Sequence, residues 1–243
     1  MVEAPEVARH RANRLLAALD QDDFARLTPF LEVIELPQGK VLYETGETIH
    51  HAYFPHDCIV SLVTVLEDGG TVETAVFGRE GVLGFSSALV TRQSFGRYVV
   101  QLPGMASRIP VARLSEAFDT SPAVRALLLR FTEALLAQTF QTVACNAVHT
   151  VEARCCRWIL STRDRVIGDT LPLTHEFLAE MLGVQRSTVS LVTRAFQSAG
   201  LISQRRGVIV ITDGTGLEEV ACECYGTIRR SFERLLPHTY PPD

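Results

Sequence analysis

Arginine and small polar side chains that could hydrogen-bond to the edges of DNA bases lie together in the C-terminal third of the chain. Arg186, Ser187, Ser190 and Arg194 would share the outer face of one helix, because residues three and four apart lie on the same side. Arginine can donate two hydrogen bonds to guanine, and serine can bond to several base edges. No Asp or Glu, which phosphate would repel, occurs between residues 183 and 212. We therefore expect this face to enter the major groove of DNA.

A helix-turn-helix motif is predicted to position this face. Thr174 is placed to cap a first short helix, and Gly183 supplies the tight turn that ends it. A second helix follows directly, as in DNA-binding helix-turn-helix proteins. The apolar residues that the second helix would bury are Val189, Val192, Phe196 and Ala199. The residues expected to contact DNA, from this motif and the hairpin after it, are Thr174, His175, Arg186, Ser187, Thr188, Ser190, Leu191, Arg194, Arg205 and Arg206.

A β-hairpin is predicted immediately after the second helix. Two β-rich segments flank the sequence Arg205-Arg206-Gly207, whose glycine favours a tight turn. The two arginines would lie at the tip, where they could contact phosphates. The chain has a formal net charge of -5, but DNA affinity depends on the local field. The acid-free, arginine-containing segment is therefore compatible with an acidic protein that binds DNA.

A long helix is predicted after Pro110, where turn residues become rare. Ser121 can cap this helix, and Pro122 suits its first turn. Apolar residues then alternate in steps of four and three, the spacing that a coiled-coil partner buries. A helix packed on its own domain could show the same stripe, and self-association is our working interpretation. The expected homodimer interface consists of Val124, Leu128, Phe131, Leu135, Gln138 and Thr142.

The N-terminal half has the pattern of an antiparallel β-domain preceded by two helices, over Glu6–Leu19 and over Asp22–Phe30 with Asp22 as the cap. Short β-branched and aromatic runs alternate with turn residues, as in a barrel or jelly roll. The expected fold class is α+β: an N-terminal antiparallel β jelly roll, a long dimerisation helix and a C-terminal winged helix-turn-helix. The expected divisions are lead-in helices at 1–30, a sensory β-barrel at 31–120, the dimerisation helix and hinge at 121–149, and the DNA-binding domain at 150–243.

Metal and haem chemistry are disfavoured by the placement of cysteine and histidine. Cys222 and Cys224 are expected in one helix over residues 217–236, where side chains two apart diverge and chelate poorly. His50 and His51 would point to opposite faces of a strand. We therefore expect no metal site and reduced thiols, with a thiol switch as an open alternative. The cysteines are Cys58, Cys145, Cys155, Cys156, Cys222 and Cys224.

Membrane proteins and enzymes are also disfavoured. No apolar run approaches the ~20 residues that a membrane helix needs, and the N-terminal residues lack the apolar core of a signal peptide. We therefore expect no membrane association and a cytoplasmic location. The sequence contains no glycine-rich phosphate loop, H-E-x-x-H motif or nucleophile elbow, so we do not expect an enzyme.

The motif Leu173-Thr-His-Glu-Phe-Leu-Ala-Glu-Met-Leu-Gly-Val184, followed by Arg186-Ser-Thr-Val-Ser190 and Gly200-Leu-Ile202, resembles that of the Crp/Fnr transcription regulators. The order of the expected elements is similar over nearly the whole chain, with weaker matches in the β-domain. The resemblance implies a cyclic-nucleotide-binding-like β-domain and a dimer that binds double-stranded DNA. Such a regulator would act with RNA polymerase. A second interpretation is a ligand-binding adaptor that acts through protein contacts.

The effector-binding pattern of the family is not retained. Where the cyclic-AMP-binding branch has Gly-Glu-x-Gly/Ala, this chain has Gly81-Val-Leu-Gly84, and the arginine of the phosphate site has no clear match. Cyclic AMP binding is therefore disfavoured. An iron-sulfur centre is disfavoured because no cysteine precedes Cys58. The cofactor remains unknown, and the candidate effector pocket consists of Gly81, Val82, Leu83, Gly84, Arg92 and Arg97.

Overall fold

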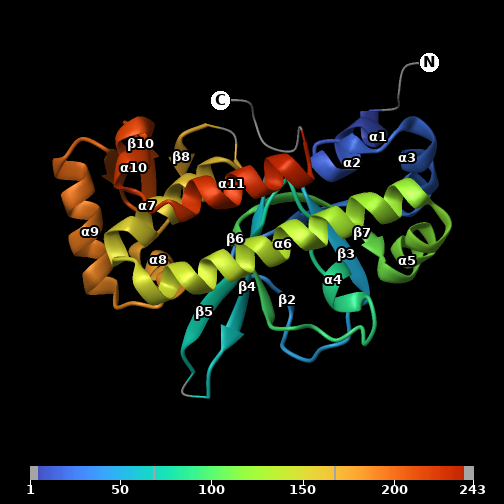
Figure 1. Cartoon of the computed structure of the whole chain (residues 1–243), viewed down its shortest axis with the longest axis horizontal. Coiled ribbons are helices and arrows are strands. Elements are labelled where there is room, and N and C mark those ends of the chain that lie inside the picture. Colours follow the sequence, from blue (N-terminus) through green and yellow to red (C-terminus); the bar gives the residue numbers. More distant parts are fainter. Residues whose placement is uncertain (1–4, 68, 167, 238–243) are drawn as a thin grey trace.

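The computed structural model describes residues 5–67, 69–166 and 168–237 (Figure 1). Its first elements are α1 (Pro5–His10), α2 (Arg14–Ala18), α3 (Gln21–Leu27) and the 3-10 helix η1 (Thr28–Phe30). The expected first helix is divided, because Asn13 caps α2 and its Oδ1 accepts hydrogen bonds from the backbone N–H groups of Leu15 and Leu16. Asp20 caps α3, where Asp22 was expected.

Seven antiparallel strands before α5 form two sheets in the described part of the chain, in the orders β1-β7-β3 and β2-β6-β4-β5. The strands are β1 (Glu32–Leu36), β2 (Val41–Tyr43), β3 (His51–Pro55), β4 (Ile59–Val65), β5 (Thr71–Phe77), β6 (Arg97–Leu102) and β7 (Gly104–Pro110). Alternate side chains, including Phe54, Phe77 and Tyr98, are buried in one core, as expected for sheets that pack face to face. We call these strands the β-sandwich, and with the helices they confirm the predicted α+β class.

Two glycines after β5 allow close packing beside the short helix α4 (Phe85–Ala88). A Cβ atom at Gly81 would lie 3.0 Å from the ring of Phe131, and one at Gly84 would lie 2.8 Å from the carbonyl oxygen of His51. Gly84 also has a φ of 86°, a conformation that glycine adopts readily. These positions therefore require glycine for packing.

The long helix α6 (Pro122–Val148) follows α5 (Val111–Thr120) and crosses the β-sandwich (Figure 1). The predicted start is confirmed, because Ser121 Oγ accepts a hydrogen bond from the Val124 N–H and Pro122 is the first helical residue.

The inner face of α6, which was predicted to form the dimer interface, packs on its own chain. The residues assigned to that interface are Val124, Leu128, Phe131, Leu135, Gln138 and Thr142; five of them are buried within their own chain, and Leu135 is half-buried against the same core. Val124, Leu128 and Phe131 are at most 2% exposed, because they pack against the β-sandwich and the N-terminal helices. A side chain that its own chain covers cannot contact a second chain. The heptad-like stripe therefore reflects packing within the protomer.

The C-terminal elements are five helices and a three-stranded sheet of order β8-β10-β9 in the described residues. They are α7 (Val151–Arg163), β8 (Thr170–Leu171), α8 (His175–Leu182), α9 (Arg186–Ser198), β9 (Ile202–Arg205), β10 (Val208–Ile211), α10 (Gly214–Val220) and α11 (Cys224–Leu235). The single helix expected over 217–236 is wrong, since α10 ends before Cys222 and α11 begins at Cys224. Cys222 and Cys224 therefore do not lie on one helix, and the expectation that their side chains diverge does not hold. No helix in the described part of the chain has the length and apolarity needed to cross a bilayer.

The C-terminal elements pack directly on the β-sandwich. Ile59, Val63 and Leu102 of the sandwich share an apolar core with Trp158 of α7 and Met181 of α8. We call this contact the junction. Burial of apolar surface on both sides favours one fixed arrangement of the two parts.

Two carboxylates are buried at or beside the junction, each paired with a side chain from α7 or the turn after it. Glu73 of β5 accepts a hydrogen bond from Trp158 Nε1 at 3.0 Å. Glu80, in the turn after β5, forms an ion pair with Arg165 at 2.7 Å, and each of these side chains is 1% exposed. Burial raises the pKa of Glu73. The junction is therefore held by polar contacts as well as by apolar ones.

Candidate nucleic-acid interface

The helix α8 begins and ends as the sequence predicts. Thr174 has extended backbone angles, and its Oγ1 accepts a hydrogen bond from the N–H of Phe177. Gly183 ends the helix with a φ of 63°, in the left-handed region that favours glycine. The chain then re-enters a helix at Arg186, which gives the predicted helix-turn-helix geometry.

The helix α9 has one buried face and one exposed face. Val189, Val192 and Phe196 are buried, as predicted, and Thr193 is buried beside them. Ala199 was expected in this group, but it is exposed because the helix ends at Ser198 and Ala199 is its C-cap.

The exposed face of α9 contains the side chains predicted to meet DNA. Arg186, Ser187 and Arg194 are exposed, and Leu191 is 68% exposed. Thr188 and Ser190 are half-buried at the edges of this face. An exposed leucine on a polar face could contact a thymine methyl group.

The strands β9 and β10 form the predicted hairpin. Arg205 pairs with Val208 in the antiparallel register, so Arg206 and Gly207 form a two-residue turn. Gly207 has a φ of 79°, which a tight hairpin turn of this kind requires. Both arginines are exposed at the tip, and we call this hairpin the wing.

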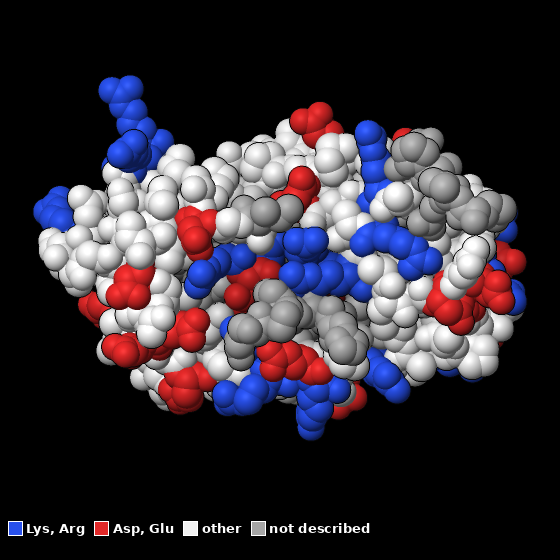
Figure 2. Space-filling model, turned by 90° about the horizontal axis from the view of Figure 1, so that it is seen from above, with Lys and Arg blue, Asp and Glu red and all other residues white. Residues whose placement is uncertain are grey.

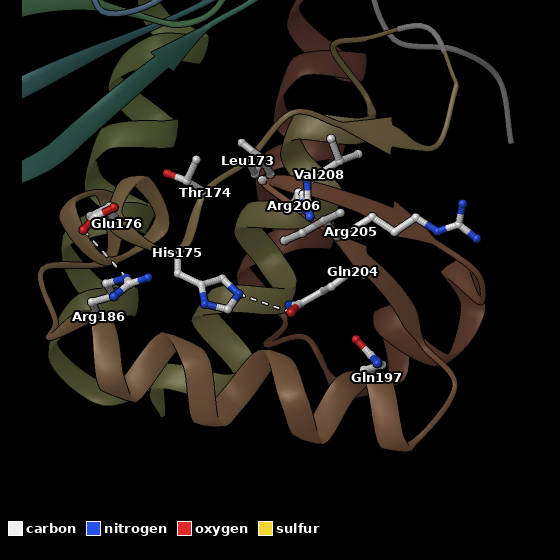
Figure 3. Close-up of a pocket in the computed structure, with 12 residues that line it drawn as sticks. Leu173, Thr174, His175, Glu176, Arg186, Gln197, Gln204, Arg205, Arg206 and Val208 are labelled. Atoms are coloured by element: carbon white, nitrogen blue, oxygen red, sulfur yellow. Dashed lines mark hydrogen bonds and ion pairs between the residues drawn. The ribbon is translucent and has the colours of Figure 1, made fainter.

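A cleft of about 490 Å³ lies between the start of α8, α9 and the wing (Figure 3). His175 lies at its base and connects the three elements. Its Nδ1 is 2.9 Å from Ser190 Oγ, and its Nε2 is 3.2 Å from Gln204 Oε1 and 3.2 Å from Thr193 Oγ1. Both ring nitrogens are thus engaged within the protein. His175 was predicted to contact DNA, whereas in the structure its ring holds α8, α9 and the wing together. Gln204, one of its partners, was not among the predicted residues.

Arg186 is paired with an acid that the sequence prediction did not consider. Its Nε lies 3.7 Å from Glu176 Oε1 (Figure 3), and the two side chains are 65% and 79% exposed. Exposed ion pairs of this kind contribute little to stability. Arg186 can therefore exchange this carboxylate for a base or a phosphate at small cost.

Basic side chains project from the end of the molecule that contains these elements. Figure 2 shows lysine and arginine side chains extending from the upper part of that end, with acidic side chains lower on the same end. The exposed arginines of α9 and the wing are Arg186, Arg194, Arg205 and Arg206. The segment that forms α9 and the wing therefore presents arginines and no acid of its own between residues 183 and 212, which favours contact with DNA at this surface.

The residues of the expected effector pocket have other roles in the structure. Val82 and Leu83 are at most 1% exposed within the core of the β-sandwich. Arg92 lies on an exposed turn with a φ of 58°. Arg97 Nε donates to Glu44 Oε2 at 2.9 Å. Buried apolar side chains and an arginine already paired with a carboxylate do not form a phosphate site.

Comparison with known proteins agrees with this geometry. Residues 153–220 match the Crp-like helix-turn-helix domain. The chain is 22% identical over 199 residues to the global nitrogen regulator of Synechococcus elongatus, and the match covers 78% of this chain and 89% of that protein. The structure is similar to FixK2 from Bradyrhizobium japonicum, with a TM-score of 0.67, 16% identity and coverage of 79% of this chain and 98% of that one. It is also similar to a Crp/Fnr-family transcriptional regulator from Thermus thermophilus, with a TM-score of 0.63, 20% identity and coverage of 78% and 98%.

The fold and the exposed recognition helix define a DNA-binding protein of the winged helix-turn-helix class. More particularly, residues 153–220 form a Crp-like helix-turn-helix domain, and the fold of the chain is similar to that of the Crp/Fnr family of transcription regulators. Proteins of this family bind DNA, act as dimers and are not enzymes.

Proposed function

We propose that the chain binds double-stranded DNA as a homodimer, with α9 of each protomer in the major groove. The observation that supports this most directly is the exposed polar face of α9. Arg186 would donate to guanine, and Leu191 would contact a thymine methyl group. The resembling family has a Glu and an Arg at the positions of Ser187 and Leu191, so the operator sequence should differ from that family's common half-site. Phosphates would be contacted by Thr174, Thr188, Ser190, Arg194, Arg205 and Arg206.

The outer face of α6 is the proposed dimer interface, in place of the buried inner face. Leu129, Leu136, Phe140 and Val143 are 49%, 50%, 69% and 61% exposed. Their spacing of seven, four and three residues places them along one side of the helix. A row of exposed apolar side chains on a long helix is unfavourable in water. A second copy of α6 would cover this row, and the two recognition helices would then lie about one DNA turn, ~34 Å, apart.

Regulation would pass from the β-sandwich to α9 through the junction. We propose the division expected from the sequence, with a sensory part at 31–120, a dimerisation helix and hinge at 121–149 and a DNA-binding part at 150–243. Gln138 Oε1 accepts a hydrogen bond from Arg165 Nη2 at 2.9 Å, so α6 contacts both parts. A shift of α6 would therefore move the recognition helices. RNA polymerase is the proposed protein partner, and the acting protein would be cytoplasmic.

Selection of bound sequences from a random DNA pool tests this proposal. A two-fold symmetric motif with half-sites one helical turn apart is expected. Arg186→Ala should then cost about 1 to 3 kcal/mol on the selected operator and much less on random DNA. Arg113→Ala, on the exposed surface of α5, is the matched control and should leave affinity unchanged.

Two results would contradict the proposal. Equal losses of affinity on operator and random DNA would show that Arg186 reads no base. Failure to enrich any sequence would favour an adaptor that acts through protein contacts.

A further inference from the structure

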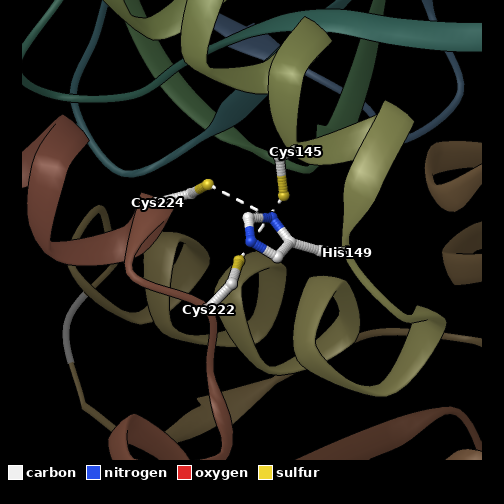
Figure 4. Close-up of side chains that lie close together, drawn as sticks. All are labelled: Cys145, His149, Cys222 and Cys224. Carbon is white, nitrogen blue, oxygen red and sulfur yellow. Dashed lines mark hydrogen bonds between the residues drawn. The ribbon is translucent and has the colours of Figure 1, made fainter.

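Four metal-ligating side chains from separate parts of the sequence meet at the C-terminal end of α6 (Figure 4). Cys145 lies in the last turn of α6, and His149 is the C-cap of that helix. Cys222 lies in the link between α10 and α11, and Cys224 is the first residue of α11. The three sulfur atoms and one imidazole nitrogen all lie within 4.8 Å of one another.

The spacing of these atoms suits a tetrahedral zinc ion. Cys145 Sγ lies 3.5 Å from Cys222 Sγ, and Cys224 Sγ lies 3.5 Å from His149 Nδ1. Zinc bonds of about 2.3 Å to sulfur and about 2.0 Å to nitrogen separate tetrahedral ligands by roughly 3.5 to 3.8 Å. Three cysteines and one histidine are also a donor set of structural zinc sites. The four side chains therefore match zinc in donor type and number, and two of their separations equal those of a tetrahedral site.

Neighbouring side chains would orient the ligands. His149 Nε2 lies 3.2 Å from Glu223 Oε2, which leaves Nδ1 directed towards the three sulfur atoms. A carboxylate bound to the second nitrogen of a ligating histidine is a common feature of zinc sites. Gln141 Nε2 donates to Cys224 Sγ at 3.0 Å, a contact that stabilises a thiolate.

Burial and charge around the cluster fit a closed structural site. The three cysteines are buried and His149 is half-buried. Arg157, which is 6% exposed, is a buried positive charge that interacts electrostatically with Cys145. Three thiolates and one Zn²⁺ would have a net charge of -1, which a nearby arginine offsets.

A disulfide between Cys145 and Cys222 explains less of the arrangement. The 3.5 Å between their sulfur atoms is well beyond the ~2.05 Å of a disulfide bond. A disulfide would also leave Cys224, His149 and the contact from Glu223 without a role. The other buried cysteines, Cys58, Cys155 and Cys156, lie outside the cluster.

We propose that Cys145, His149, Cys222 and Cys224 bind one Zn²⁺ that fixes the end of α6 to the link between α10 and α11. The ion would hold residues 145–149, the predicted hinge, next to the C-terminal helices α10 and α11. If the chain binds DNA as proposed above, zinc would hold α9 in a defined orientation relative to α6. The sequence prediction of no metal site is revised by this proposal.

Metal content of the full-length protein, purified under reducing conditions, tests the site directly. Elemental analysis should find about one zinc per chain in the wild type. Zinc-depleted wild type should bind Co²⁺ and give the visible bands of tetrahedral cobalt with thiolate-to-cobalt charge transfer. Cys224→Ser and His149→Ala should lose or weaken these signals, whereas Cys155→Ala, a buried cysteine outside the cluster, should keep them.

Glu223→Gln separates metal binding from folding, because this exposed side chain pairs with the proposed ligand His149. It should weaken zinc binding by about 10- to 100-fold and leave the fold intact. The proposal is overturned if reduced wild-type protein neither retains zinc nor binds Co²⁺ tetrahedrally. It is also overturned if protein isolated without any chelator contains no zinc and has a Cys145–Cys222 disulfide.

DNA affinity tests the structural consequence separately. Removal of zinc from the wild type should weaken operator binding by about 5- to 150-fold, the usual range of coupling between two sites. If zinc binds and its removal leaves operator affinity unchanged, the proposed role of zinc in orienting α9 relative to α6 is refuted, while the metal site stands. If no DNA binds in either form, the proposed function fails while the metal measurements remain decisive for the site.

Discussion

The buried ion pair between Glu80 and Arg165 gives the sharpest test of how the junction is held. The Arg165 guanidinium donates from Nε to Glu80, from Nη1 to the Ser161 carbonyl at 2.7 Å and from Nη2 to Gln138. A Cβ at Gly78 would lie 2.7 Å from Arg165 Cβ, so the aliphatic part of the arginine is closely enclosed. The pair therefore connects the β-sandwich, α6 and the turn after α7.

Replacing Arg165→Met removes the charge and keeps most of the apolar length. Glu80 would then be a buried carboxylate without its cation, and its Oε2 already has no hydrogen-bond partner. Breaking a buried pair from one side costs about 3 to 5 kcal/mol. For a chain of this size, that loss corresponds to a decrease in Tm of about 6 to 20 °C. The double variant Glu80→Gln, Arg165→Met should recover much of the loss, since no uncompensated charge remains.

Urea unfolding at a fixed protein concentration measures these differences, because a dimer's stability depends on concentration. Arg163→Met is the matched control, since Arg163 lies two residues earlier and forms a partly exposed pair with Asp169 at 2.7 Å. Its loss should be at most about 1 kcal/mol. A loss for Arg165→Met no larger than that of the control would refute the reasoning that burial makes this pair costly to break. A double variant as unstable as the single one would do the same.

Three further predictions concern pH, assembly and DNA binding. Burial raises the pKa of Glu73 above its ordinary 4.5, so its contribution to stability is present below that value and is lost as pH rises through the raised pKa. Glu73→Gln should therefore flatten the fall in unfolding free energy as the pH rises above 4.5, and an unchanged slope in urea unfolding at a series of pH values would contradict this. Phe140→Arg should give monomers by light scattering, Ala123→Arg should leave the dimer intact, and a persistent Phe140→Arg dimer would exclude the outer face of α6 as the interface. Joint replacement of Arg205 and Arg206 by Ala should reduce the slope of log affinity against log salt by about 1.8, as expected for two lost phosphate contacts, and a slope like that of the wild type would show that the wing does not contact phosphate.

The sequence determined the local architecture of the DNA-binding elements. The cap at Thr174, the glycine turn at Gly183 and the apolar spacing of α9 are local signals, because capping, φ preference and helical periodicity depend on residues only a few positions apart. Gly207 set the turn of the wing for the same reason. These predictions are confirmed in the described structure.

Only the tertiary structure decided which face of α6 is buried and which residues from distant segments meet. The helix has apolar residues on two faces, and the stripe containing Leu128 and the row containing Leu136 both suit a partner; the β-sandwich covers the first. The contact of Cys145 with Cys222 joins residues 77 positions apart, and it depends on the break between α10 and α11. Spacing in the sequence reports neighbours along one element, whereas the packing of elements against each other determines which side chains are brought together across the fold.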